Sequence, residues 1–273
     1  MKKGLIFIMI LAVLISAMTG CSSSVTEDTD TIKIGVASPY TGDYAQFGDY
    51  TKDGVELAVE EINKAGGVLG KPIQIVYGDD KGDSKEAVSV AQKFASDKGI
   101  VGIIGHFFSG ATLAAGPIYQ QNEIPTIAVA STNPDVADIG DYVFRINVGD
   151  NYQGSQLAQL LKDKGYNKVS VIYDNSDYGK GVSDVFTQSF TEIGGEVLLN
   201  ESYLGGQDKD FSLILTKVKN TDTEVIILVS YYTEASLIIQ QARNIGIDVP
   251  FYASDSLYVI SMNLIQVRRH RNL

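Results

Sequence analysis

The sequence predicts an α/β fold with parallel sheets, because short apolar runs alternate with amphipathic segments and several of these runs are apolar on both faces. Strands that are apolar on both faces are typical of parallel sheets buried under helices. Repeated strand–helix alternation indicates right-handed crossovers stacked on such a sheet. The runs that we expect to form strands are 32–37, 72–77, 100–105, 124–129, 169–173 and 225–229.

The segments between these runs have the periodicity of helices. In 48–64, Val55, Ala58, Val59 and Ile62 recur with the i, i+3, i+4, i+7 spacing that makes one apolar face. Ser84 is expected to cap the N-terminus of the next helix. The predicted helices are 48–64, 84–98, 151–164, 178–193, 211–219 and 233–244.

The domain organisation predicted from the sequence is two Rossmann-like lobes joined by a hinge. The chain has 273 residues, enough for two domains of about 100–150 residues after removal of a leader. Composition changes near 145–148, between two similarly patterned halves, so we place lobe 1 at 31–147 and lobe 2 at 148–258. The formal net charge of -11 argues against nucleic acid as a partner.

The N-terminus reads as a lipoprotein signal peptide at 1–20 followed by a polar tether at 21–30. A basic start precedes the apolar segment 4–17, which is shorter than the roughly 20 residues of a membrane span. Met18-Thr19-Gly20-Cys21 resembles a bacterial lipobox, and Cys21 is the only cysteine. Lipid on Cys21 would hold an exported protein at the outer face of the cell membrane. The alternative is an ordinary signal peptide or an uncleaved anchor.

Hydroxyl groups and aromatic rings follow three of the predicted strands, at 38–49, 106–112 and 130–134. In a doubly wound sheet these strand ends meet at one edge, where ligands bind. Hydroxyls and free N–H groups at helix starts suit a carboxylate, and aromatic rings can wall an apolar side chain. Any one of these segments is explained equally well by helix capping, but the convergence of three favours a binding site.

Five phrases of the sequence, in order, resemble the branched-chain amino-acid binding proteins, which have the type I periplasmic-binding fold and supply ABC importers. The phrases are 41–48, 66–72, 131–134, 173–179 and 207–211, and the resemblance covers about 32–258. It implies that the chain binds a small amino-acid-like ligand by hinge closure. It also implies ABC permease subunits as partners and no cofactor. The lipobox-like segment adds the lipid membrane as a partner through acylated Cys21.

The resemblance also assigns site residues. Ser109 and Thr132 would meet the ligand carboxylate, with backbone groups of Ala130 and Ser131 beside them. Asp255 would meet the ammonium group. Many relatives have glutamate at this position, so the shorter acid leaves the identity of the ligand open. Tyr178 would lie beside the ligand backbone, and the side-chain pocket would be lined by Phe47, Phe107, Phe108 and Tyr231.

An enzyme is not expected. His106 precedes Ser109, but the segment lacks the glycine that a nucleophile elbow requires two residues before the serine. No Gly-x-Gly-x-x-Gly follows the first strand, which argues against a dinucleotide site. Asp79-Asp80 has no histidine or cysteine nearby to complete a transition-metal site, and an oxygen-only Ca²⁺ site has no further support.

Two alternatives remain open. The same fold serves as a ligand-sensing module for amides, urea or other small solutes. The resemblance stops after Tyr258, and 259–273 is a basic segment outside the family pattern. This segment is interpreted as the product of a frameshift or as the end of an assembled nucleotide sequence. In either case the chain is incomplete in lobe 2 and is a truncated remnant. The other interpretation is a basic tail that contacts anionic lipid.

Overall fold

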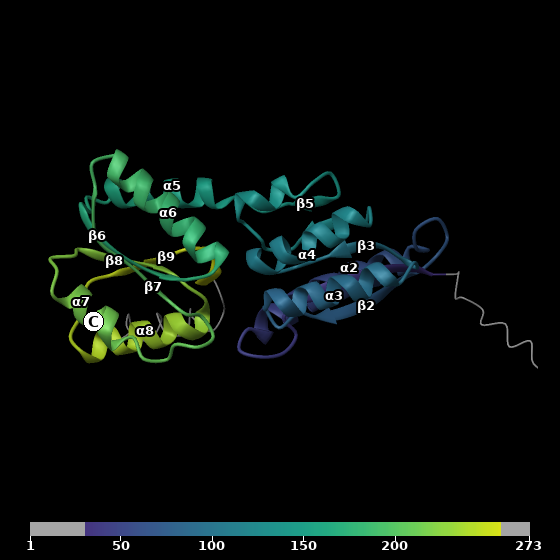
Figure 1. Ribbon diagram of the computed structural model, residues 1–273, viewed down its shortest axis with the longest axis horizontal. Helices are drawn as coiled ribbons and strands as arrows, with labels where there is room; N and C mark the ends of the chain where they lie inside the picture. The colour runs from purple at the N-terminus through teal and green to yellow at the C-terminus, as the bar shows by residue number, and fades with distance from the viewer. Residues whose placement is uncertain (1–30, 258–273) are drawn as a thin grey trace, which may run out of the picture. The chain divides into compact units, whose positions relative to one another are not determined.

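The computed structural model describes residues 31–257 as two parallel sheets, each with helices on both faces (Figure 1). The signal peptide, the tether with Cys21, and the segment 259–273 lie outside the described residues. The strand orders are β2-β1-β3-β4-β5 and β7-β6-β8-β9, and all neighbouring strands within these two sheets are parallel. The predicted α/β class with parallel sheets in two sets is therefore confirmed.

The first sheet is formed by β1 (Ile32–Ser38), β2 (Ile73–Asp79), β3 (Ile100–Ile104), β4 (Thr126–Ala128) and β5 (Val143–Arg145). Helices α3 (Ser84–Ser96) and α4 (Ser109–Gln121) pack together on one face. Glycine allows α3 to approach this sheet closely. A Cβ at Gly35 would lie 2.9 Å from Phe94 Cδ2, and one at Gly78 would lie 2.4 Å from Val90 Cγ1, both of which belong to α3.

Helix α2 (Ala45–Lys64) lies on the opposite face, where Ser38 Oγ at the end of β1 donates to Thr51 Oγ1 at 3.0 Å. Its predicted apolar face is only partly covered by the described residues. Val55 and Val59 are half-buried, Ala58 is exposed and Ile62 is 38% exposed. On the same side of the sheet, the register-paired Ile127 and Phe144 are 44% and 52% exposed. Residues 31–257 thus leave an apolar surface open beside α2.

The second sheet is formed by β6 (Lys168–Asp174), β7 (Glu196–Tyr203), β8 (Val225–Val229) and β9 (Phe251–Ala253). Helices α5 (Asp150–Asp163) and α6 (Asp177–Glu192) pack together on one face. Helices α7 (Ser212–Lys219) and α8 (Tyr232–Asn244) pack together on the other face (Figure 1). All five residues of β8 are buried, as its continuous apolar run requires.

The chain passes from the first sheet to the second between Arg145, which ends β5, and Asp150, which begins α5. The proposed lobe boundary at 147/148 falls in this connection. Two short 3₁₀ helices, η1 (Pro134–Asp138) and η2 (Asp255–Leu257), follow β4 and β9. Among the described residues, no helix is long and apolar enough to cross a membrane.

One capping prediction is wrong. Ser84 is the first residue of α3, and Asp83 caps the helix by accepting hydrogen bonds from the N–H groups of Lys85 and Glu86. Both residue types cap helices well, and the carboxylate also complements the positive end of the helix dipole.

Candidate functional site

A cavity of about 190 Å³ lies where residues from both sheets meet. Lobe 1 supplies residues from α2, from the turn into α4 and from the end of β4, and lobe 2 supplies the start of α6, the residue before α8 and η2. Carboxyl ends of parallel strands are where open α/β folds place ligands. The lining residues are Phe47, Tyr50, Phe107, Phe108, Ser109, Ala130, Tyr178, Tyr231, Asp255 and Ser256.

Eight of the ten predicted site residues line this cavity, whereas Ser131 and Thr132 lie behind its wall. The sequence reasoning missed Tyr50 and Ser256. Tyr50 is one helical turn after Phe47 and faces the same way, so the i, i+3 spacing was an available signal. Ser256 follows the predicted acid directly and gave no signal of its own.

Ser109 lies in the part of the cavity wall that suits a carboxylate. It is the first residue of α4, whose N-cap residue Phe108 makes no side-chain capping bond. Ser109 Oγ accepts hydrogen bonds from the N–H groups of Thr132 and Asn133, both at 3.3 Å. The Ser109 hydroxyl can therefore donate its proton in a hydrogen bond to a ligand. It lies at the N-terminus of α4, which favours negative charge.

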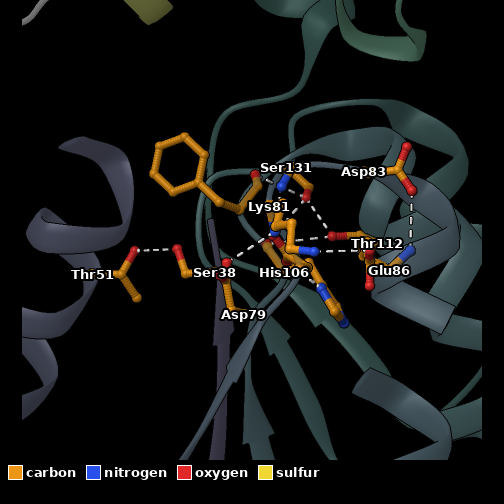
Figure 2. Close-up of polar contacts among 12 residues, drawn as sticks. Ser38, Thr51, Asp79, Lys81, Asp83, Glu86, His106, Thr112 and Ser131 are labelled. Carbon is orange, nitrogen blue, oxygen red and sulfur yellow. Dashed lines mark hydrogen bonds and ion pairs between the residues drawn. The ribbon is translucent and has the colours of Figure 1, made fainter. Parts of the chain in front are cut away.

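The Ser131 side chain points away from the cavity. Its Oγ lies 2.6 Å from Thr112 Oγ1, and the two side chains face each other in Figure 2. It also donates toward the carbonyl oxygens of His106 and Phe107 at 3.4 and 3.3 Å. Ser131 therefore ties the loop after β4 to the loop after β3, and only its backbone lies near the site.

Asp255 lies on the lobe 2 side of the cavity. Tyr178 Oη donates to Asp255 Oδ1 at 2.7 Å and lies 3.1 Å from Ser256 Oγ. Burial raises the pKa of Tyr178 well above its ordinary value, and the nearby Asp255 charge adds to this effect. Tyr178 is therefore a hydrogen-bond donor at all physiological pH values, and the acid is held in one orientation.

Aromatic rings form most of the remaining wall of the cavity. Phe47 stacks on Phe107 with ring centroids 4.6 Å apart, and Phe108 meets Tyr231 edge to face at 4.7 Å. Tyr178 and Tyr231 stack at 5.6 Å. Phe47, Phe108, Tyr178 and Tyr231 are each less than 8% exposed. A dry aromatic pocket of this kind suits an apolar side chain.

The two lobes also contact each other beside the cavity. Tyr232 Oη donates to the Asp43 carbonyl at 2.8 Å, and Tyr44 Oη lies 3.4 Å from Glu234 Oε2. Asn133 Nδ2 donates to the Asp177 carbonyl at 3.0 Å on the other side. Direct interlobe hydrogen bonds of this kind enclose the space between the sheets.

The remaining candidates have structural roles. His106 is fully buried, with Nδ1 2.6 Å from Asp80 Oδ2 and Nε2 3.0 Å from Tyr119 Oη. Ser109 is not among its partners. Asp79 Oδ1 accepts the N–H groups of Tyr40 and Lys81 and so shapes the loop after β1. No group of three metal-ligating side chains occurs within the described range.

Comparison with known proteins finds relatives that are similar in sequence. Leu/Ile/Val-binding protein homolog 1 of Brucella suis is 36% identical over 228 residues, which cover 83% of this chain and 61% of that protein. The homolog 2 of Brucella abortus is 36% identical over 94% of this chain and 67% of its own length. The chain thus spans about three fifths of the length of the first of these relatives.

Two solved structures are similar to the chain. One is the branched-chain amino acid transporter substrate binding protein LivJ of Streptococcus pneumoniae in complex with isoleucine, with 36% identity, a TM-score of 0.76, and coverage of 82% of this chain and 64% of that one. The other is the leucine binding protein LivK of Thermotoga maritima, with 33% identity, a TM-score of 0.77, and coverage of 81% and 63%.

The sequence of residues 31–263 matches the periplasmic binding protein family, and the chain belongs to that family.

Proposed function

We propose that this protein binds a branched-chain or closely related small amino acid outside the cytoplasm and delivers it to an ABC importer, without catalysing a reaction. The observation that carries the proposal is the polarity of the cavity. Ser109 at the α4 N-terminus and Asp255 both line the cavity, and aromatic rings make up most of the remaining lining. This arrangement matches the carboxylate, ammonium and aliphatic side chain of such an amino acid. The Leu/Ile/Val-binding relatives support the same ligand class.

Closure of the lobes follows from this division of the site. Ser109 and Ala130 belong to lobe 1, whereas Tyr178 and Asp255 belong to lobe 2. A ligand that contacts both sets favours the state in which they are close, because a ligand shifts an equilibrium only by its differential affinity. The hinge would be the connection between β5 and α5.

The test is a thermal melt with L-leucine, L-isoleucine and L-valine, with D-isoleucine as the matched control. A ligand at 100 times its dissociation constant stabilises the folded state by about 2.7 kcal/mol, which shifts the midpoint measurably. We expect a shift with at least one L-amino acid and none with D-isoleucine, which cannot present both charged groups to Ser109 and Asp255 with its side chain in the pocket. A cooperative melt that none of them shifts would contradict the proposed ligand class.

We also propose that Cys21 carries the lipid anchor. The lipobox-like segment that ends in Cys21 supports this, and Cys21 is the only cysteine in the chain. Expression of the Cys21→Ser variant in a bacterial host should move the protein from the membrane fraction to the soluble fraction or leave its leader uncleaved. An unchanged distribution and mass would contradict lipidation.

A further inference from the structure

A fully buried carboxylate lies next to the cavity, and the Thr132 hydroxyl is the donor that faces it. Asp150, the first residue of α5, is 0% exposed, and within residues 31–257 neither carboxylate oxygen makes a hydrogen bond of good geometry. Its backbone N–H donates to the Thr132 carbonyl at 3.0 Å. An unpaired buried carboxylate costs several kcal/mol, so its presence calls for a physical reason.

Thr132 links Asp150 to the site. Its hydroxyl is buried and faces the Asp150 carboxylate without making a hydrogen bond of good geometry in the described part of the chain, while its N–H reaches Ser109 Oγ at 3.3 Å. The pKa of Asp150 is raised to about 6, chiefly by burial, while the Thr132 hydroxyl beside the carboxylate acts in the opposite direction. The charged groups that face Asp150 are Asp255, which contributes to raising this pKa, and Arg145, which lowers it.

The packing around Asp150 comes from both lobes. A Cβ added to Gly181 of α6 would lie 2.9 Å from Asp150 Oδ2, so a glycine is needed for the helix to pass this close to the carboxylate. The same Cβ would lie 3.6 Å from Asn133 Nδ2, which donates to the Asp177 carbonyl. Asp150 therefore lies at the crossing between the sheets, among groups that come from both lobes.

We propose that Asp150 is a positioning residue for ligand binding. In its ionised form it orients the Thr132 hydroxyl and thereby the segment 130–132, which borders the cavity. The same carboxylate adds a negative charge behind the ammonium group that Asp255 holds. The role rests on the proposed function, because it requires an ammonium group at Asp255. It explains why a carboxylate is kept buried at this position.

Ligand binding is then coupled to proton release. Before binding, the two carboxylates repel each other, which favours the protonated form of Asp150. An ammonium group at Asp255 replaces this repulsion with attraction and favours the ionised form. Binding therefore releases a proton near pH 6, and by linkage the affinity falls as the pH drops through this range.

The experiment is calorimetric titration of the purified full chain with L-isoleucine, L-leucine and L-valine from pH 5 to pH 8, in buffers of different ionisation enthalpy at pH 6. We expect several-fold weaker binding at pH 5 than at pH 7, with net proton release at pH 6. Asp150→Asn should bind at least five-fold more weakly at pH 8 and should lose most of this pH dependence. The matched control is Asp163→Asn, at an exposed aspartate of the same helix, which should behave as the wild type.

The outcomes separate this role from the proposed function. If the wild type binds none of the three amino acids at any pH, the proposed function is overturned and this role with it. If the wild type binds but Asp150→Asn keeps the same affinity and pH profile, only the role of Asp150 is overturned. If Asp150→Asn fails to fold, the role is tested instead by measuring proton release on binding by the wild type, Thr132→Val and Thr132→Ser. The serine variant should keep the pH dependence of binding better than the valine variant. If the wild type releases no proton on binding, the role of Asp150 is overturned.

Discussion

Tyr178 Oη donates a 2.7 Å hydrogen bond to Asp255 Oδ1, although the two residues are 77 positions apart in the chain. Tyr178 lies in the first turn of α6, and Asp255 begins η2 after β9. The parallel arrangement of β6, β8 and β9 brings the two segments to one edge of the second sheet. The hydrogen bond holds the carboxylate at the cavity wall before any ligand arrives.

Asp255→Asn should weaken amino-acid binding more than Tyr178→Phe does. Removing the charge that pairs with the ligand ammonium costs about 2–5 kcal/mol of binding free energy. Removing only the tyrosine hydroxyl loses one hydrogen bond that orients the acid, which is worth about 0.5–1.5 kcal/mol, or somewhat more where the acceptor is charged. Calorimetric titration with L-isoleucine measures both. Wild-type affinity in Asp255→Asn would rule out this residue as the ammonium ligand.

The two glycines within α2 should respond oppositely to substitution by alanine. A Cβ at Gly48 would lie 2.3 Å from the Pro39 carbonyl oxygen and 2.9 Å from Tyr40 Cα, both of which are backbone atoms. Gly48→Ala must therefore shift the helix or the loop, at a cost of about 1–3 kcal/mol. A Cβ at Gly54 meets nothing within 4 Å, so Gly54→Ala should stabilise the helix by up to about 1 kcal/mol.

Urea unfolding of the two variants gives the comparison, and each serves as the control for the other. Because Gly48 follows Phe47, Gly48→Ala should also disturb the aromatic wall and weaken ligand binding, whereas Gly54→Ala should not. Equal changes in the free energy of unfolding would show that the contact with Pro39 does not constrain α2.

The strands that the sequence predicted best are those with long apolar runs. The five-residue apolar run 225–229 is β8 over its whole length, and all five side chains are buried. The convergence of strand ends also predicted most of the cavity, because in a parallel sheet it follows from topology without knowledge of side-chain packing. Phe107, Phe108 and Ser109 come directly after β3 and line the cavity as expected.

Elements whose formation depends on tertiary contacts could not be predicted in this way. Helix α4 contains Pro117, which lacks an N–H group and disfavours a helix interior, and its small residues give little apolar periodicity. Strands β5 and β9 have three residues each, too few for a pattern to stand out. The juxtaposition of Asp150 with Thr132 arises from the crossing between the sheets, which brings a helix start against a loop from the other lobe.

The buried pair of His106 and Asp80 should stabilise lobe 1 and leave the ligand chemistry unchanged. Asp80 Oδ2 lies 2.6 Å from His106 Nδ1, and its Oδ1 accepts the Gly82 N–H at 2.9 Å. Both side chains are 0% exposed. His106→Phe leaves the Asp80 carboxylate buried without its partner, and removing one member of a buried pair costs about 3–5 kcal/mol.

Tyr119→Phe is the milder companion variant, because it removes only the hydrogen bond to His106 Nε2, worth about 1 kcal/mol. A double-mutant cycle with His106→Phe and Asp80→Asn measures the coupling in the free energy of unfolding. We expect Asp80→Asn to be much less costly, or even stabilising, when His106 is already absent. Strictly additive effects of the two substitutions would contradict a direct interaction.

The contribution of Asp150 to the stability of the ligand-free protein should decrease as the pH rises from about 4 to about 6. Burial raises the pKa of this carboxyl to about 6 in the folded state, whereas its ordinary value is 3.8. Between these values the folded state binds more protons than the unfolded state, so the free energy of unfolding falls with rising pH. A shift of this size corresponds to roughly 3 kcal/mol, of which the side chain's rearrangement will recover part.

Urea unfolding of the wild type and of Asp150→Asn from pH 4 to pH 8 isolates this contribution. The difference between the two should be small at pH 4 and should grow in favour of Asp150→Asn up to about pH 7, because only the wild type must bury an ionised group there. Asp174, whose pKa is also raised to about 6 by burial, contributes equally to both proteins and cancels. Asp163→Asn should show no such growth. If the difference in the free energy of unfolding between wild type and Asp150→Asn does not change with pH, Asp150 titrates normally and its burial carries no electrostatic cost. If the difference grows as expected, the variant that stabilises the free protein should also weaken ligand binding. That combination is typical of a carboxylate that serves function at the expense of stability.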